Sequence, residues 1–391
     1  MSEYQYYEFQ AIDRPLTPEQ QDQIRKLSSR VRPTATQAVF TYSYSDFRGD
    51  PLTVLEQHFD AMLYTANWGS KQLAFRFPRP AVVVEHLEAY SIEVESDYAN
   101  GVSLRSSPEH IILNIEYHDD EPPDWIEGEG VLGSLIPLRE DILRGDFRAL
   151  YLAWLKAAAM MAEPGDEPWD EEEDSGSDGE EAELIEPPVP PGLGHLTGPL
   201  QALVEFLDID EDLVRAAASA SPRMERTHEP VEAWIKLLPE AERDAFLVRV
   251  AHGETHVGVE LMRRLREVAG SHSQAEGRLP ARRSFATLVA VAESIRLRRK
   301  AQERQAAEQV RIRRLEALAQ REPETWQQVM TLIEQKQAKA YDEAVKLLVE
   351  LRDLAQHRGE IVQFEARMSA IHERHAKSRT LLERLRKARL L

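Results

Sequence analysis

The sequence predicts an α+β N-terminal domain, a mixed sheet with helices, followed by an all-α C-terminal half with a long helix and helical hairpins. Two observations predict this division. Of the 28 Phe, Trp and Tyr residues, 20 lie in residues 1–162, and aromatic side chains favour pleated, half-buried strands. The rest of the chain is rich in Ala, Leu, Glu, Arg and Gln, which favour helices.

A short acidic segment separates the two halves. Residues 163–186 carry thirteen acidic and no basic side chains, and four prolines follow within residues 187–191. Such a segment buries too little apolar surface to offset the entropy of ordering it. We therefore predict an α+β domain over 1–162, an acidic, Pro-rich disordered linker over 163–191, a helical domain over 192–280, and a long charged helix with helical hairpins over 281–391.

Strand patterns recur through the N-terminal domain. Aromatic-rich or alternating runs predict strands at 4–9, 39–44, 73–77, 91–95 and 111–117. Helices begin at Thr17-Pro18 and at Asp50-Pro51, because each pair places a capping side chain before a proline in the first turn. The second of these helices is expected to present Leu52, Leu55, Phe59 and Leu63 on one face. The order of strands and helices favours a split βαβ arrangement.

Helical periodicity dominates the C-terminal half. Ser284 is expected to cap a helix that continues to Arg321, and these 38 residues would extend about 57 Å as a helix. Pro323 begins a further helix, and Gly359 ends the leucine-rich one after it. Short joints between such helices indicate antiparallel hairpins, and we expect coiled-coil character in this part.

Composition excludes several classes of protein. The chain has 391 residues, a formal net charge of −20 and no cysteine, so disulfides, thiol nucleophiles and Cys-ligated zinc are excluded. The first ten residues lack the basic and apolar regions of a secretory signal. The most apolar segment, residues 149–162, is shorter than the roughly 20 residues of a membrane span. We expect a cytoplasmic protein that does not contact membranes.

Two motifs resemble ligand sites but lack essential parts. Gly128–Gly133 matches the glycine spacing of a dinucleotide-binding loop, yet Glu129 places negative charge where pyrophosphate would bind. His252 and His256 have the spacing of a helical zinc pair, but Gly253 stands where metalloproteases have Glu. We interpret the first as a loop and the histidines as surface or capping residues. We expect no cofactor and no metal, and no catalytic residue is identified.

The strongest electrostatic feature is a set of basic residues in and just before the long helix. It could contact nucleic acid or an acidic partner, and it could equally dock the chain's own acidic linker, but a solvated charged helix is the commonest explanation of such a pattern. The candidate polyanion contacts are Arg282, Arg283, Arg296, Arg298, Arg299, Lys300, Arg311, Arg313 and Arg314.

Two resemblances accompany these patterns. The opening block YQYYEFQAIDRPL (residues 4–16), together with Asn67-Trp68-Gly69 and Pro188–Gly194, resembles an uncharacterised bacterial family with no established activity. The segments 341–351 and 367–385 are similar to helical tails of bacterial SWIM-type zinc-finger proteins. A SWIM zinc site needs cysteines, so the resemblance implies neither the zinc site nor zinc-dependent DNA contact.

The leading interpretation is a non-enzymatic interaction or scaffold protein that binds an unknown protein partner. The first alternative is a nucleic-acid-associated protein that acts through the basic helix over 282–321. The second is an enzyme with an unrecognised site in the N-terminal domain. Strong salt dependence of binding would favour the first alternative, and a deep pocket of ionisable side chains with shifted pKa values would favour the second.

Overall fold

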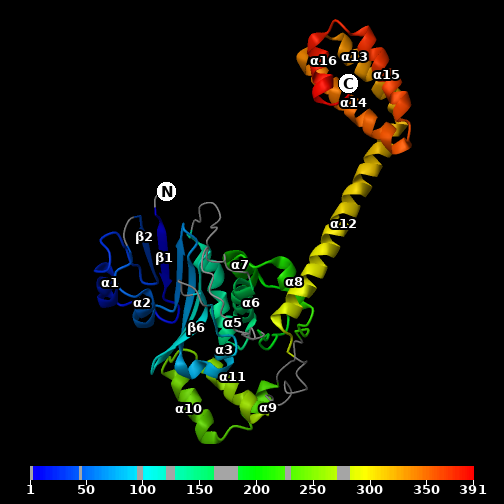
Figure 1. The fold of residues 1–391 in the computed structure, drawn as a ribbon. Coiled ribbons are helices and arrows are strands. Elements are labelled where there is room, and N and C mark those ends of the chain that lie inside the picture. The colour runs from blue at the N-terminus through cyan, green and yellow to red at the C-terminus, as the bar shows by residue number, and fades with distance from the viewer. Residues whose placement is uncertain are drawn as a thin grey trace, which may run out of the picture. The chain divides into compact units, whose positions relative to one another are not determined.

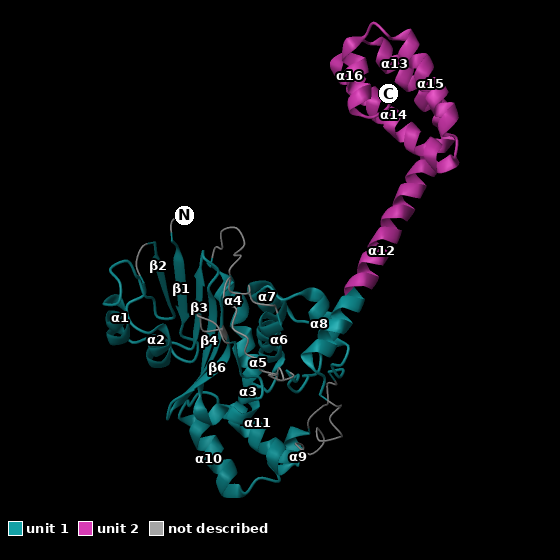
Figure 2. Ribbon diagram, in the orientation of Figure 1, with its two compact units in different colours: residues 1–295 teal, residues 296–391 magenta. Residues whose placement is uncertain are grey.

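The computed structural model describes residues 3–43, 46–94, 100–119, 128–162, 184–224, 230–270 and 282–391 (Figure 1). The chain divides into two compact units, residues 1–295 and 296–391 (Figure 2). The predicted architecture is confirmed: a sheet with helices comes first, and a helical C-terminal half with a long helix follows.

Unit 1 is built on a seven-stranded sheet with the order β2-β1-β3-β4-β7-β6-β5. Every neighbouring pair is antiparallel. A mixed sheet would also contain parallel pairs, so this detail of the prediction is wrong. However, β2 and β3 both pair with β1 from opposite sides and are joined through a helix, which is a split βαβ arrangement. The strands are β1 (Gln5–Gln10), β2 (Gln37–Tyr42), β3 (Ala61–Ala66), β4 (Lys71–Pro78), β5 (Ile92–Val94), β6 (Asn100–Ser106) and β7 (His110–Tyr117).

Two short helices cover one face of the sheet. In α1 (Pro18–Arg25), the Thr17 side chain accepts from the Gln20 amide and the Gln20 side chain accepts from the Thr17 amide, which is a capping box. The helix α2 (Pro51–His58) is capped by Asp50. Both predicted helix starts are confirmed. Beneath these helices lies an aromatic core that includes Phe9 and Phe40.

The predicted extension of the second helix to Leu63 is wrong. The helix α2 ends at His58, and Phe59 already has extended backbone. The following AMLYTA segment forms the interior strand β3, in which five of the six residues are buried. A strand buried on both faces has no alternation, so its apolar residues match helical spacing equally well.

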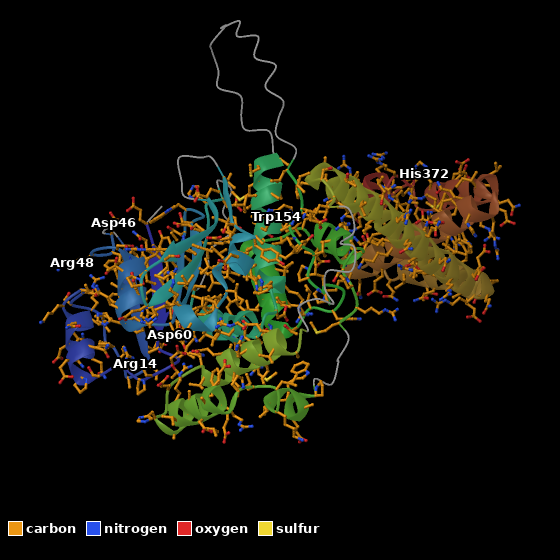
Figure 3. All side chains as sticks on the ribbon, turned by 90° about the horizontal axis from the view of Figure 1, so that it is seen from below. Arg14, Asp46, Arg48, Asp60, Trp154 and His372 are labelled. Carbon is orange, nitrogen blue, oxygen red and sulfur yellow. The ribbon has the colours of Figure 1, made fainter. Side chains whose placement is uncertain are left out.

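The opposite face of the sheet carries the larger helical layer (Figure 1). Its main helix, α6, is the apolar segment of the sequence, and nearly all of its first eleven residues are buried. Trp154 on α6, labelled in Figure 3, packs edge-on against Phe285, with ring centroids 6.1 Å apart. The layer contains α4 (Val131–Leu135), α5 (Pro137–Leu143), α6 (Arg148–Ala162), α7 (Gly198–Leu207) and α8 (Glu211–Ala218).

Further helices complete unit 1. The turn η1 (Arg79–Ala81) and α3 (Val84–Glu88) follow β4. Later in the chain come α9 (Val231–Ile235), α10 (Glu240–Ala251) and α11 (Val257–Val268). The first residues of α12 (Phe285–Gln320) also belong to this unit, because Phe285, Leu288 and Ala292 are part of its core.

The predicted domain boundaries differ from these units. The helices expected to form a separate domain over 192–280 share one hydrophobic core with the sheet, since Leu200, Leu203 and Leu213 belong to the same cluster as Leu73 and Phe75. The unit boundary falls at 295/296, inside the long helix, rather than at 280/281. The physical reason is that one face of the sheet needs a helical cover larger than residues 128–162 supply.

The predicted linker differs from the structure over its last residues. Residues 163–183 lie outside the described residues, but residues 184–191 pack into unit 1. Ile185 forms an antiparallel bridge with Ser284. The Glu186 amide donates to the Arg283 carbonyl at 2.9 Å, and Tyr90 donates its hydroxyl to the Pro188 carbonyl at 2.9 Å.

Unit 2 is entirely helical. Its core surrounds α14, whose Ala344 and Leu348 are fully buried, and Gly359 ends that helix in the left-handed conformation, as predicted. Leu315 and Leu318 at the end of α12 pack against Leu354. The remaining helices are α13 (Glu322–Glu334), α14 (Ala338–Arg358), α15 (Ile361–Arg374) and α16 (Arg379–Lys387). Within the described residues, no helix combines the length and apolar character needed to cross a membrane.

Candidate functional site

The predicted polyanion contacts do not form one site. Arg282 and Arg283 belong to unit 1, whereas the other seven belong to unit 2. The Arg283 guanidinium forms a bidentate pair at 2.7 and 2.8 Å with the carboxylate of the buried Glu186, a residue of the predicted acidic segment. Tyr151 also donates its hydroxyl to Glu186. Arg283 therefore anchors the start of α12.

The remaining bases spread along α12. Arg299 pairs with Glu303 at 3.2 Å, Arg311 pairs with Glu308 at 3.6 Å, and Arg314 pairs with Glu350. Arg296 is half-buried, and the exposed members of the set are Arg282, Arg298, Lys300, Arg311, Arg313 and Arg314. All side chains from 300 to 310 are exposed, so this stretch of α12 packs against no core. Polyanion contact stays a prediction.

A polar cluster interrupts the aromatic face of the sheet. Gln72 on β4 donates to Asn114 at 2.8 Å and to the Glu116 carboxylate at 3.1 Å, both on β7. Burial raises the pKa of Glu116, while the hydrogen bond with Asn114 opposes the rise. Burial also raises the pKa of the neighbouring Tyr64 to about 12. These side chains hydrogen-bond with one another across β4 and β7, so the cluster stabilises the sheet and does not by itself indicate a catalytic site.

A buried ionic network, which the sequence did not predict, ties the sheet to the helices. The Arg139 guanidinium on α5 donates to both Asp13 oxygens at 2.8 Å, and the Arg139 Nε donates to the Arg76 carbonyl at 2.8 Å. Arg139 also lies 5.5 Å from the centre of the Phe77 ring. The Arg139 side chain is only 3 % exposed, so its positive charge would destabilise the fold without the Asp13 carboxylate as a partner.

Asp60, labelled in Figure 3, binds the backbone of the same loop. Its carboxylate accepts from the amides of Ile12 and Asp13 at 2.7 and 2.9 Å, and from the Arg76 guanidinium at 2.6 Å. Because Asp60 is fully buried, it fixes the Asp13 backbone and thereby aims the Asp13 side chain.

His256 brings α11 into this network. Its Nε2 lies 2.8 Å from Asp13 Oδ2, and the residue precedes the first turn of α11 in the left-handed conformation. Burial acts to raise the pKa of Asp13, but the nearby His256 ring and the hydrogen bonds from Arg139 outweigh it and hold that pKa well below its usual value. One carboxylate thus joins α5 and α11 to the loop after β1.

The same two helices border a cavity in unit 1, with a volume of about 590 Å³. Its walls are residues 81–87 of η1 and α3, residues 140–147 at the end of α5, and residues 258–266 of α11. Gly258, Val259, Met262, Arg263 and Arg266 recur at helical spacing, so they form one face of α11. The volume lies within the range typical of small-molecule sites.

The cavity is apolar inside and positively charged overall. Aliphatic and aromatic side chains, including Val82, Leu87 and Phe147, dominate its lining. Three arginines also line it, against the single glutamate Glu140. Arg144 pairs with Glu140 at 2.9 Å on the exposed surface, and Arg263 lies 3.8 Å from Glu267.

Sequence reasoning missed this site for a simple reason. Its three walls are far apart in the chain, and each carries ordinary apolar and basic residues. His256, interpreted from the sequence as a surface or capping residue, is not part of the lining; the structure places it before α11 and against Asp13.

Comparisons with known proteins add no assignment. No protein-family model, curated protein or solved structure matches this chain. Among the described residues, no group of three His, Cys, Asp or Glu side chains is arranged to hold a metal ion.

Proposed function

We propose that the protein is a non-enzymatic interaction protein whose unit 1 binds an apolar group in the cavity between α3, α5 and α11. The single observation that carries this proposal is the cavity itself, which combines about 590 Å³ of space with a mostly apolar lining. An apolar cavity open to a ligand favours burial of an apolar group, since such burial removes hydrocarbon surface from water. An unknown protein partner and a cytoplasmic location belong to the same proposal.

The arrangement of the walls supports binding rather than catalysis. The ionisable groups that line the cavity are arginines, His86 and Glu140, and Glu140 pairs with Arg144. The buried carboxylates of the ionic network, Asp13 and Asp60, are held by arginines and backbone amides. The network fixes α5 and α11, which keeps the cavity preformed, and preformed sites bind with a smaller entropic cost.

A neutral apolar dye tests the proposal, because it reports apolar binding without any electrostatic contribution. We expect Nile red to bind the intact protein with a blue-shifted, enhanced fluorescence and a stoichiometry near one. Gly258→Phe should abolish this binding. A Cβ at Gly258 meets no atom within 4 Å, so the added ring enters open space and the helix keeps its backbone.

Gly133→Phe provides the matched control. Gly133 lies on α4, is not part of the cavity, and also has nothing within 4 Å of an added Cβ. Circular dichroism should show both variants folded. Equal dye binding by the two variants would contradict the proposal, as would no binding by the intact protein.

A further inference from the structure

We infer that the cavity of unit 1 accepts an anionic amphiphile: one unbranched hydrocarbon chain with a carboxylate headgroup. The inference rests on the proposed function, since it specifies the ligand of the same cavity. Two independent features of the lining support it, the apolar walls and the surplus of arginine.

The walls suit a flexible hydrocarbon chain. Val82, Leu87, Leu143, Phe147, Val259 and Met262 contribute side chains without charge from all three walls. Met262 is unbranched and adaptable, so it can pack against chains of different length. Gly258 leaves additional room beside them, because no atom lies within 4 Å of its absent Cβ. A phosphodiester backbone would gain nothing from such walls.

The arginines specify the charge of the headgroup. Arg144, Arg263 and Arg266 line the cavity together with one acid, Glu140. The Arg144–Glu140 pair is exposed, with 69 % and 43 % of the side chains accessible, and the Arg263–Glu267 pair is long at 3.8 Å. Exposed or long ion pairs contribute little, so a carboxylate ligand can compete with Glu140 for Arg144 and with Glu267 for Arg263. The planar fork of arginine matches a carboxylate in a bidentate manner.

Isothermal titration of the full chain with linear carboxylates of eight to twelve carbons, below their micellar concentrations, tests both features. Each added methylene should strengthen binding by about fourfold, as expected for a buried CH₂ group. Dodecanol, with the same chain but no charge, should bind about tenfold more weakly than dodecanoate, because it lacks charge-assisted hydrogen bonds. Dodecyl phosphate is the arm that separates carboxylate from phosphate recognition, because arginine pairs with both groups.

Variants distinguish the headgroup contact from the chain contact. Arg263→Gln should bring the affinity for dodecanoate close to that for dodecanol and leave dodecanol binding unchanged. Arg264→Gln is the matched control, because the adjacent Arg264 lies on α11 outside the cavity and pairs with Glu242 at 2.6 Å. Gly258→Phe should abolish binding of both compounds.

The outcomes separate this inference from the proposed function. If Nile red binds in the cavity but dodecanoate binds no better than dodecanol, the anionic ligand is wrong and the apolar site stands. An equal loss of dodecanoate affinity in Arg263→Gln and Arg264→Gln would overturn the headgroup assignment. Tighter binding of dodecyl phosphate would overturn the preference for a carboxylate. If neither Nile red nor dodecanoate binds, both proposals fail.

Discussion

A single carboxylate, that of Asp13, connects three parts of unit 1. It accepts two hydrogen bonds from Arg139 on α5 and lies against His256 before α11, while its own backbone amide donates to Asp60. Its side chain is 11 % exposed and that of Arg139 is 3 % exposed. Removing one partner of such a buried pair leaves the other charge without compensation.

Asp13→Asn should therefore destabilise unit 1 by about 3 kcal/mol at pH 7. Because the pKa of Asp13 is lower in the folded state, its contribution is complete above the unfolded pKa of about 3.9 and is lost as pH falls through the folded pKa. The free energy of unfolding of the variant should therefore fall less steeply than that of the unsubstituted protein as the pH is lowered. Urea denaturation between pH 2 and pH 7 measures both effects.

Asp22→Asn is the control for this prediction. Asp22 pairs with Arg25 on the exposed surface of α1, where ion pairs contribute at most about 1 kcal/mol. If Asp13→Asn is no more destabilising than Asp22→Asn, the network does not hold the helices.

The residues of this network illustrate the limit of sequence reasoning. Asp13 and His256 are 243 positions apart, and neither lies in a periodic pattern that would reveal the other. The capping residues Thr17 and Asp50, by contrast, are predictable because each acts on an amide two or three residues away. Local chemistry is legible in one sequence, whereas long-range pairing depends on the tertiary fold.

Among the elements, α12 combines three different environments. Its first residues, including Phe285 and Leu288, are buried in unit 1, and Leu315 and Leu318 are buried in unit 2. Between them, residues 300–310 are exposed on every side. A helix that is polar all round is typical of segments that join separate packed parts.

One alternative left open by the sequence is nucleic-acid contact through the basic residues of α12. If this is correct, replacing Arg298, Lys300 and Arg313 by Gln should weaken binding of a 20-base-pair DNA duplex at 50 mM salt. The slope of log K against log salt should fall by about 0.9 for each phosphate that the variant no longer neutralises. Fluorescence anisotropy over a salt series measures it.

The same charge change elsewhere provides the control. Arg25, Lys26 and Arg30 are exposed residues of unit 1, and their replacement by Gln removes three charges without altering α12. An equal effect of the two triple variants would indicate a response to net charge alone. No DNA binding by the intact protein would remove the nucleic-acid alternative.

The elements also show where pattern reasoning works and where it fails. The long helix is predictable within one residue at each end because Ser284 begins it and no Gly or Pro interrupts it. The strand β3 escapes prediction because a strand buried on both faces loses its alternation. The prolines of residues 184–191 suggest an extended tether, yet Glu186 is buried against Arg283.

At the scale of the molecule, each unit has a hydrophobic core of its own. The core of unit 1 includes the sheet and the first turns of α12, and that of unit 2 surrounds α14. Separate cores favour separate cooperative unfolding. A ligand of the cavity should therefore stabilise unit 1 alone, because the cavity is lined entirely by residues of that unit.

Differential scanning calorimetry of the full chain, with and without dodecanoate, tests the central claim that unit 1 is a ligand-binding unit. We expect two transitions, of which Asp13→Asn lowers only that of unit 1. Free dodecanoate at 100 times its dissociation constant should stabilise that transition by about 2.7 kcal/mol, raising its midpoint by about 5 °C, and leave the other in place. The account would be contradicted if dodecanoate did not raise the midpoint of the unit 1 transition, which Asp13→Asn identifies. It would also be contradicted if dodecanoate shifted only the transition of unit 2.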